Sequence, residues 1–422
     1  MQTATGEAIT KSWQDVIVLS PTGSGKTLAY LLPTLTKINT KQPKVQMAVV
    51  VPGRELALQS ANVVNNMGCG IRAMALYGGR PAMDEHRNMK KMMPHVVFAT
   101  PGRLNDHLDK GNICPDDIVM LVIDEFDKCL AMGFHDEMRK LTENLPNVRQ
   151  RVLLSATDAD SIPHFVNIHH AIKVNFLVDV EQVPERVKVF TVHSPEKDKL
   201  ETLAKLLCEL QNQSSIVFLN FRDSVERTDL FLRRKGFVTS SLHGGMEQKL
   251  REDALFKFSN GSSYVLVATD LASRGLDIPD IDNIIHYHLP LGADEYIHRV
   301  GRTARWTAEG RTFFILGPEE TLPEYVEAET VEHQIPDQLS SPSHPRMATV
   351  YIGKGKADKI SKGDIAGFLC KKGGLQMSEI GRIDLKDRYA YAAVIFEKLS
   401  QVVSMTKGEK IKGIKTIVEP VR

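Results

Sequence analysis

The sequence has few cysteines and no long apolar run. Its five cysteines are scattered along 422 residues without a C-x-x-C pair, which argues against a disulfide framework or a zinc site and predicts a reducing, cytoplasmic location. No apolar run approaches the roughly 20 residues that span a bilayer, and no secretory signal precedes the first predicted strand. We therefore expect no membrane association.

The chain also lacks a large overall charge, but its charge is unevenly distributed. The formal net charge is +1. Residues 347–422 hold 15 Lys and Arg against 8 Asp and Glu, a net charge of +7, so the preceding residues carry −6. This asymmetry suggests that the C-terminal region binds a polyanion, although charge alone is equally compatible with a solvated lysine-rich surface.

Short apolar runs separated by helical periodicity predict two α/β domains. The first series lies at 16–20, 45–51, 95–100, 120–123 and 152–155, and the second at 216–220, 264–269, 284–288 and 312–316. Continuous apolar strands alternating with helices indicate parallel sheets covered on both faces. We place the domains at 1–180 and 187–330, with a hinge at 179–186.

A different pattern begins after a linker at 331–346, which contains a stretch rich in proline and serine. Residues 347–422 read as strand (349–352), helix (361–372), strands (380–385 and 389–396), helix (398–405) and strand (416–421). Ser361 is the expected N-cap, with Asp364 three residues later. The βαββαβ order predicts a small α+β, ferredoxin-like domain of the kind used in RNA-recognition modules.

The sharpest local signal is SPTGSGKT at 20–27, between a strand and a helix. Glycines allow backbone N–H groups to point at phosphate oxygens. In this arrangement Lys26 reaches the β- and γ-phosphates and the Thr27 hydroxyl ligates Mg²⁺. Ser20 occupies the place of the first glycine of the strict motif, but the strand–loop–helix order predicts a nucleotide site rather than a structural turn. The predicted cofactor-binding residues are Thr22, Gly23, Ser24, Gly25, Lys26 and Thr27.

The stretch MLVIDEFD at 120–127 is an apolar strand that ends in acidic residues. Acids at a strand end are usually surface charge, but a phosphate loop upstream favours catalysis. Asp124 is then placed to hold Mg²⁺, and Glu125 to orient or deprotonate the attacking water. Together the two motifs predict ATP hydrolysis.

These motifs and several others resemble the DEAD-box RNA helicases over nearly all of residues 1–317. The others are PGRELA (52–57), GG (78–79), TPGR (100–103), SAT (155–157), VFLNF (217–221), HGGMEQKLR (243–251), ATDLASRGLD (268–277) and HRVGRTAR (298–305). Each is weak alone, but their order and spacing are specific. The resemblance implies two RecA-like parallel-sheet domains that bind ATP, Mg²⁺ and RNA.

The resemblance also implies residue roles. RNA-backbone contacts fall to Arg54, Gly79, Thr100 and Arg103 in the first domain and to Arg251 and Thr269 in the second. Coupling between the ATP site and domain closure falls to Ser155, Thr157, Asp127, His298 and Arg299. Asp277 resembles a nucleotide-sugar contact, and Arg302 and Arg305 resemble arginine fingers.

Some positions depart from the family pattern. Of the adenine-reading element before the phosphate loop, only Gln2 has a counterpart, so the start looks truncated and we expect weakened ATP affinity and adenine selectivity. Phe126 replaces Ala in the acidic motif, which would place a bulky side chain close to Mg²⁺. Gly53 replaces Thr, and Ala304 replaces the final Gly.

The C-terminal segment resembles the RNA-binding domain of DbpA-type helicases, through VYIGKGKADKISKGDIAGFL, EIGRIDL, YAYAAVIFE and KIKGIKTIVEPV. That resemblance implies binding to structured large-subunit ribosomal RNA within pre-ribosomal particles, by a monomer. Strand alternation places Val350, Ile352, Ala390, Ala392 and Val394 on one face. Tyr351, Tyr389 and Tyr391 share the other, where rings could stack on bases or be ordinary strand tyrosines.

Two other functions stay open at this point. A DNA helicase of the same superfamily would use similar twin domains, although HRVGRTAR and SAT favour RNA. A non-processive RNA-binding clamp with weakened ATPase activity would fit the departures at the N-terminus and at Phe126. Lys26, Asp124, Glu125, Arg302 and Arg305 argue against the clamp.

Overall fold

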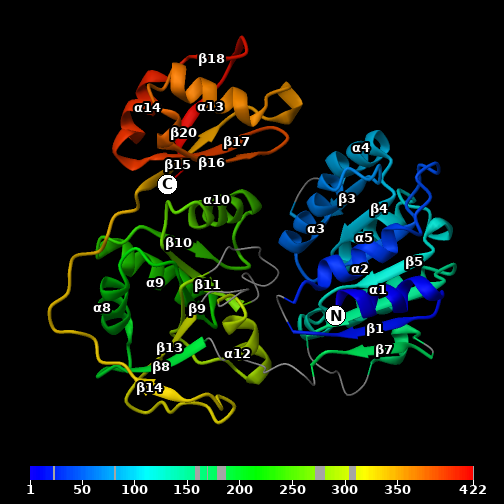
Figure 1. Ribbon diagram of the computed structural model, residues 1–422, viewed down its shortest axis with the longest axis horizontal. Helices are drawn as coiled ribbons and strands as arrows, with labels where there is room; N and C mark the ends of the chain where they lie inside the picture. Colours follow the sequence, from blue (N-terminus) through cyan, green and yellow to red (C-terminus); the bar gives the residue numbers. More distant parts are fainter. Residues whose placement is uncertain are drawn as a thin grey trace. The chain divides into compact units, whose positions relative to one another are not determined.

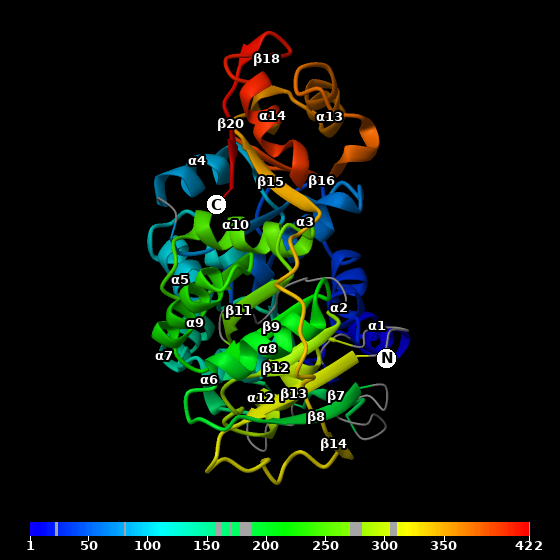
Figure 2. The ribbon, with the colours of Figure 1, turned by 90° about the vertical axis from the view of Figure 1, so that its left-hand side faces the viewer.

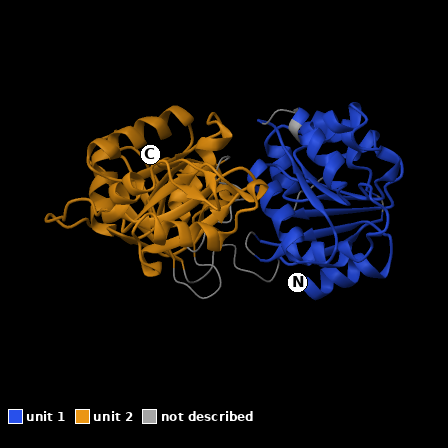
Figure 3. Ribbon diagram, turned by 90° about the horizontal axis from the view of Figure 1, so that it is seen from above, with its two compact units in different colours: residues 1–182, 274–277 blue, residues 183–273, 278–422 orange. Residues whose placement is uncertain are grey.

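The chain folds into two compact units in the computed structural model, residues 1–182 with 274–277 and residues 183–273 with 278–422 (Figure 3). The structure describes residues 1–21, 24–79, 82–156, 162–168, 170–177, 187–270, 281–303 and 310–421. The hinge predicted at 179–186 lies outside these residues. Among the described helices, none is long and apolar enough to cross a membrane.

The first unit is a seven-stranded parallel sheet flanked by helices (Figure 1). Its strands are β1 (Val16–Leu19), β2 (Met47–Val50), β3 (Ala73–Leu76), β4 (Val96–Ala99), β5 (Met120–Ile123), β6 (Gln150–Ser155) and β7 (Ile172–Asn175). Its helices are α1 (Gln2–Lys11), α2 (Lys26–Leu35), α3 (Arg54–Asn66), α4 (Ala82–Met92), α5 (Pro101–Asp109), α6 (Phe126–Ala131) and α7 (His135–Glu143), with 3-10 turns at Pro115–Asp117 and His164–Val166. The strand order is β3-β4-β2-β5-β6-β1-β7.

Burial on both faces explains why these strands are continuously apolar. Met47 and Val49 of β2 belong to one core cluster, whereas Ala48 and Val50 belong to another. Because successive side chains of a strand point to opposite faces, the two clusters are the two covered sides of one sheet.

The larger part of the second unit repeats this architecture. Its strands are β8 (Val187–His193), β9 (Ser215–Leu219), β10 (Thr239–Leu242), β11 (Val265–Thr269), β12 (Asn283–His286), β13 (Gly310–Leu316) and β14 (Thr330–Glu332), in the order β10-β11-β9-β12-β13-β8-β14. Its described helices are α8 (Leu200–Leu210), α9 (Arg222–Arg234), α10 (Gln248–Ser259) and α12 (Ala293–Val300). Counted from the first strand of each sheet, the two orders are identical.

The C-terminal domain is a four-stranded antiparallel sheet with two helices, as predicted. Its order is β16-β17-β15-β20, built from β15 (Met347–Ile352), β16 (Ile380–Leu385), β17 (Ala390–Ile395) and β20 (Val418–Pro420). The helices are α13 (Lys362–Lys371) and α14 (Leu399–Met405), with 3-10 turns at Lys356–Asp358, Met377–Glu379 and Phe396–Lys398. A small hairpin, β18 (Lys410–Ile411) with β19 (Ile414–Lys415), was not predicted.

Two local predictions can be compared directly. Ser361 caps α13, because its hydroxyl accepts a hydrogen bond from the Asp364 N–H at 3.2 Å and the Asp364 carboxylate accepts one from the Ser361 N–H at 2.8 Å. The predicted boundary at 330/331 is wrong by a few residues. Strand β14 crosses it and pairs with β8, so the second sheet extends to Glu332 and the linker begins later.

Candidate functional site

The phosphate loop follows β1 at the carboxyl edge of the first sheet. Gly25 directly precedes α2 with φ of +86°, a left-handed conformation that glycine adopts without steric cost. A Cβ added at Gly25 would lie 2.9 Å from Nε2 of Gln2. The Ser20 hydroxyl lies 2.7 Å from Ser24 Oγ and 3.0 Å from Sδ of Met1. The structure therefore brings Gln2 against the loop, and its role in reading adenine stays a prediction. Thr22 and Gly23 lie outside the described residues.

Lys26 begins α2, and Thr27 follows it. The Lys26 ammonium donates to the carbonyl oxygens of Ser20 and, at 3.0 Å, of Pro21. Burial lowers the pKa of Lys26 to about 8, against the opposing field of Asp124. The lysine is thus a desolvated cation held by neutral carbonyls within its own loop.

The acidic residues after β5 complete a buried charge cluster with Lys26. Asp124 is 3% exposed, and burial, helped by the neighbouring charge of Glu125, raises the pKa of Asp124 to about 6. Oε1 of Glu125 accepts from the Lys128 ammonium at 2.6 Å, and Lys128 is itself buried. Carboxylate and hydroxyl oxygens are hard ligands that suit Mg²⁺, and a buried ammonium suits phosphate. These side chains therefore suit Mg²⁺ and a nucleoside triphosphate.

Strand order explains why these residues meet. Strands β5, β6 and β1 are neighbours in the sheet, so their carboxyl ends share one edge. The Ser20 N–H donates to the Ser155 carbonyl at 3.0 Å, and the Ala156 N–H donates to Asp127 at 3.4 Å. Ser155 and Asp127, predicted as coupling residues, thus connect the phosphate loop with the acidic motif. Thr157 lies outside the described residues.

Phe126 does not have the position that the sequence analysis expected. Its ring is 1% exposed and belongs to the core cluster that contains Ile123, Cys129 and Leu153. The side chain therefore points into the core and does not crowd a metal held by Asp124. The expectation is corrected: the larger residue fills the core beneath the acidic motif.

The predicted RNA residues of the first domain lie at the ends of three adjacent strands, β3, β4 and β2. Arg54 begins α3 after β2, Gly79 follows β3, and Thr100 is the N-cap of α5 after β4. Gly79 has φ of +90°, a backbone conformation that favours glycine, and a Cβ at Gly79 would lie 2.7 Å from Nη1 of Arg54 and would displace that guanidinium. Arg54, Gly79 and Thr100 thus form one candidate strip for phosphate contacts.

Arg103 depends on residues that the sequence analysis missed. Its Nε donates to the Glu85 carboxylate at 2.7 Å, and the same carboxylate contacts His107 Nε2 at 3.1 Å. Glu85 is 4% exposed. Because Glu85 lies in a helix without any recognised motif, no signal in a single sequence points to it.

In the second domain Arg299 is the centre of a buried polar cluster. Its guanidinium is 1% exposed and donates to Asp270 at 2.6 and 2.8 Å, to Asn220 at 2.8 Å and to the His288 carbonyl at 2.7 Å. Asp270 and Asn220 follow β11 and β9, so Arg299 joins α12 to two strand ends. Both partners lie in recognised motifs, yet only their position in the fold assigns them this role.

The remaining predicted residues of this domain are mostly buried or outside the described part. His298 and Arg302 are 6% and 3% exposed. Thr269 ends β11, and Arg251 of α10 donates to the His243 carbonyl at 3.0 Å. Asp277 and Arg305 lie outside the described residues.

The three tyrosines of the C-terminal sheet share one face, as predicted, with ring centroids 5.4 to 6.0 Å apart. That face packs against α10 (Figure 2). Tyr391 is buried, stacks on Phe256 at 5.0 Å and donates to Asp253. Tyr389 donates to Glu252. The prediction for Tyr391 is corrected, because its ring lies inside an intramolecular contact and has no surface open to a base.

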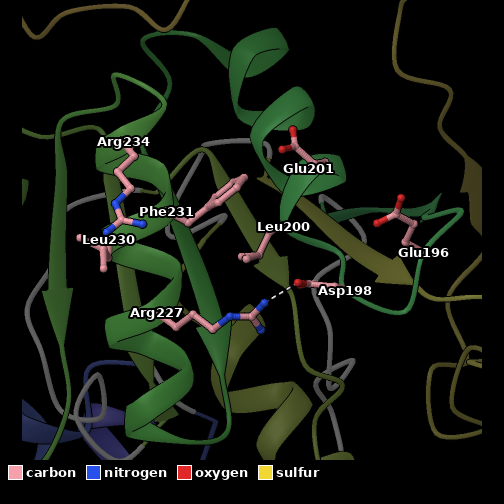
Figure 4. Close-up of a pocket in the computed structure, with 8 residues that line it drawn as sticks. All are labelled: Glu196, Asp198, Leu200, Glu201, Arg227, Leu230, Phe231 and Arg234. Atoms are coloured by element: carbon pink, nitrogen blue, oxygen red, sulfur yellow. Dashed lines mark hydrogen bonds and ion pairs between the residues drawn. The ribbon is translucent and has the colours of Figure 1, made fainter.

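The second domain has a loop in the place of the phosphate loop. Residues 194–199, Ser-Pro-Glu-Lys-Asp-Lys, connect β8 to α8. The Lys199 ammonium donates to the Ile315 carbonyl at 2.9 Å and to Glu320 at 2.6 Å. Figure 4 shows Asp198 of this loop paired with Arg227 of α9 beside a hollow that Glu196 also lines. The charges of Asp198 and Lys199 are therefore neutralised within the domain.

Comparison with known proteins identifies the class. Residues 1–164 match the DEAD/DEAH box helicases, 198–307 the helicase conserved C-terminal domain, and 349–420 the DbpA RNA binding domain. The chain belongs to the DEAD-box family of ATP-dependent RNA helicases.

Within that family the chain is similar to DbpA over nearly its whole length. It is 33% identical to "ATP-dependent RNA helicase DbpA" of Escherichia coli (strain K12), over 95% of this chain and 89% of that protein. It is 30% identical to DbpA of Bacillus subtilis (strain 168), over 95% and 90%. Among solved structures, Mss116p bound to ssRNA and AMP-PNP has a TM-score of 0.68 and 26% identity, over 77% of this chain and 72% of that one.

Proposed function

We propose that this helicase couples ATP hydrolysis to the local opening of short RNA duplexes in large-subunit ribosomal RNA, acting as a cytoplasmic monomer on pre-ribosomal particles. The observation that carries the proposal is the carboxyl edge of the first sheet. It holds the buried Lys26–Asp124–Glu125 cluster after β1 and β5, and the Arg54–Gly79–Thr100 strip after β2, β3 and β4.

The ATP site uses residues in distinct roles. Lys26 holds the β- and γ-phosphates. Gln2 contacts the adenine, and Gly25 allows the tight turn of the loop. Thr27 and Asp124 would hold Mg²⁺, which would neutralise charge on the phosphates. Glu125 orients the attacking water and accepts its proton, and Lys128 fixes Glu125 in place at 2.6 Å. Arg302 and Arg305 supply positive charge to the transferring phosphate when the two helicase domains close on ATP.

ATP and RNA act on the same conformational equilibrium. Each favours the closed form, so each raises the affinity for the other. A closed surface that accepts a bent single strand excludes a duplex, and hydrolysis then reopens the protein. The neighbour Mss116p was solved with single-stranded RNA and a nucleotide analogue together, which supports joint occupancy.

The C-terminal domain supplies the choice of RNA. Its net charge of +7 favours a polyanion, and its match to the DbpA RNA binding domain favours RNA. That this RNA is ribosomal is our proposal, from the resemblance of the segment to DbpA-type helicases. Since the tyrosine face is packed on α10, exposed lysines outside that face are the phosphate contacts available in this form. Lys371, Lys410 and Lys415 are exposed examples.

A charge-reversal experiment tests this division of labour. Lys371, Lys410 and Lys415 changed together to Glu should leave maximal ATP turnover unchanged and raise the concentration of a ribosomal RNA fragment needed for half-maximal stimulation. Because three phosphate contacts are lost, the slope of log RNA affinity against log salt concentration should become shallower by about 2 to 3. The control reverses Lys90, Lys91 and Lys173 of the first domain. The targeting role would be refuted if both triple variants weakened stimulation equally, and did so to the same extent with ribosomal and with random RNA.

A non-processive RNA clamp is the alternative that the departures at the N-terminus favoured. The burial of Phe126 in the core removes one of its supports. Steady-state ATP turnover separates the clamp from the helicase.

A further inference from the structure

A cavity of about 290 Å³ lies where the second helicase domain meets the C-terminal domain. Its walls come from the turn between α9 and β10, the end of α10, the start of β15 and the start of α14. Two hydrogen bonds close its side: Asn260 Nδ2 donates to Thr349 Oγ1 at 2.9 Å, and the Thr349 hydroxyl donates to Ser262 Oγ at 3.0 Å. The cavity is thus part of a built contact within one compact unit.

Lys257 of α10 lines this cavity and, among the described residues, is buried without a direct partner for its ammonium. It is 7% exposed, and within the described part of the chain its ammonium has no hydrogen bond or ion pair. Burial lowers the pKa of Lys257 to about 8. Burial disfavours the charged form of an amine that has no direct partner, so an anion in the cavity would stabilise the ammonium of Lys257.

The carboxylates near Lys257, Asp229 and Asp253, form no ion pair with it. Nε of Arg233, which also lines the cavity, donates to Asp229 at 2.9 Å, and its Nη2 donates to the Thr239 carbonyl at 3.3 Å. Asp229 thus neutralises Arg233, and the Asp253 carboxylate, four residues before Lys257 on α10, partly opposes the lowering of the pKa of Lys257 without forming an ion pair with it. Among the described residues, the charged side chains that line the cavity itself, Arg233 and Lys257, are both basic. One anionic group is the complement.

The other walls are apolar and partly aromatic. Phe237 is buried, while Phe396 is 44% exposed and stacks on His344 with ring centroids 6.3 Å apart. Met347 and Leu399 complete the apolar lining. A flat aromatic body attached to a phosphate therefore fits this combination of walls and charge better than inorganic phosphate alone.

We propose that this cavity binds one unpaired nucleotide, with its phosphate at Lys257 and its base against the Phe237 and Phe396 walls. The inference rests on the RNA binding of the family, and it adds a site between the helicase body and the C-terminal domain. The nucleotide comes either from a bound RNA strand or from a free mononucleotide, and the experiment distinguishes the two sources.

Amine acylation of the full chain, read by mass spectrometry at single lysines, tests the site directly. A phosphate beside Lys257 raises the pKa of its amine, and a rise of one unit makes acylation roughly tenfold slower near neutral pH. The probes are single-stranded oligouridine, uridine 5′-monophosphate and inorganic phosphate, with exposed Lys205 on α8 as internal control. Protection of Lys257 by oligouridine at lower concentration than by the monophosphate assigns the site to RNA; protection by the monophosphate at equal or lower concentration assigns it to a free nucleotide. Unchanged labelling with every probe, or protection by phosphate as strong as by either nucleotide probe, overturns the proposal.

Substitution gives an independent readout that separates binding from structure. Lys257→Met keeps the aliphatic stem and removes the charge, and Lys257→Arg keeps the charge. The slope of log affinity for single-stranded RNA against log salt should fall by about 0.7 in the Met variant and recover in the Arg variant. A folded Met variant with an unchanged slope contradicts an RNA source. RNA-stimulated ATP turnover should persist in both variants, so failure of this site is distinguishable from failure of the helicase function.

Discussion

The two helicase domains place a Ser-Pro turn and a lysine at the same point of the same fold, yet only one of these loops suits a nucleotide. Each loop connects the first strand of its sheet to the following helix, and the two sheets have identical strand orders. Ser20 to Lys26 spans seven residues with glycines at 23 and 25. Ser194 to Lys199 spans six, with Glu196, Lys197 and Asp198 in their place.

The difference lies in what each lysine contacts. Lys26 donates to two neutral carbonyls of its own loop and lies in the field of Asp124. Lys199 is bound to the Glu320 carboxylate at 2.6 Å, which neutralises it. The comparison teaches that the fold supplies the position, while glycine content and a lysine that forms no ion pair within the described residues distinguish the loop that suits phosphate.

The largest expected effect is the difference between alanine substitutions of the two lysines. Lys26→Ala should abolish nucleotide binding and reduce ATP turnover roughly 100-fold or more, the scale of one lost transition-state contact. Lys199→Ala should leave the KM for ATP unchanged in the protein that stays folded. Binding of a fluorescent ATP analogue and steady-state turnover measure both. Equal losses of ATP affinity in the two variants would break the comparison.

Glu125→Gln should give the next largest effect. The amide cannot accept a proton, so hydrolysis should slow by roughly 100- to 10,000-fold. ATP should still bind, because Lys26 is intact, and a form holding ATP and RNA together should accumulate. Single-turnover hydrolysis and RNA retention in the presence of ATP measure the two effects. Hydrolysis at the unchanged rate would show that Glu125 does not act on the water.

The pH dependence of kcat/KM for ATP should reflect the ionisation of Asp124 and Lys26 in the first domain. In the proposed site Asp124 would bind Mg²⁺ as a carboxylate, so activity should fall below its pKa of about 6, where the carboxylate is protonated. Lys26 holds phosphate as an ammonium, so activity should fall above its pKa of about 8. We expect a bell-shaped profile that loses about tenfold per pH unit outside these limits, with the two groups titrating as a coupled pair. A flat profile from about pH 5 to about pH 9 would contradict it.

The smallest expected effect is on stability, from breaking the Lys199–Glu320 ion pair of the second domain. Lys199→Met removes the partner of Glu320 but leaves that carboxylate 38% exposed to water. Solvent screening reduces the cost of a broken buried pair, so unfolding should become easier by about 1 to 2 kcal/mol. Denaturant unfolding measures the loss, and Lys199→Met combined with Glu320→Gln should recover part of it. No recovery would mean that Lys199 acts through packing.

Continuous apolar strands could be predicted from the sequence, because burial on both faces leaves a strong pattern. Strands β1, β2, β4, β5 and β9 were found this way. Strands β3, β7, β8 and β14 were missed; β3, β7 and β14 are edge strands, and β8 is the neighbour of β14. Strand β10 (TSSL) was missed because it is mostly polar.

The candidate site shows the same division between local and tertiary information. The phosphate loop and acidic motif are local patterns, so they could be predicted. Glu85 beneath Arg103 and Lys257 in its cavity depend on tertiary packing and have no local signature. Likewise, alternation placed Tyr391 on the correct face, but only the folded chain shows that α10 covers it.

Steady-state ATP turnover of the full chain, with and without RNA, tests the central claim most directly. The account predicts slow turnover alone, strong stimulation by RNA, loss of both with Lys26→Ala, and retention of both with Lys199→Ala. Single-stranded DNA of the same sequence should stimulate far less. Turnover that RNA does not change, or that survives Lys26→Ala, would contradict the account.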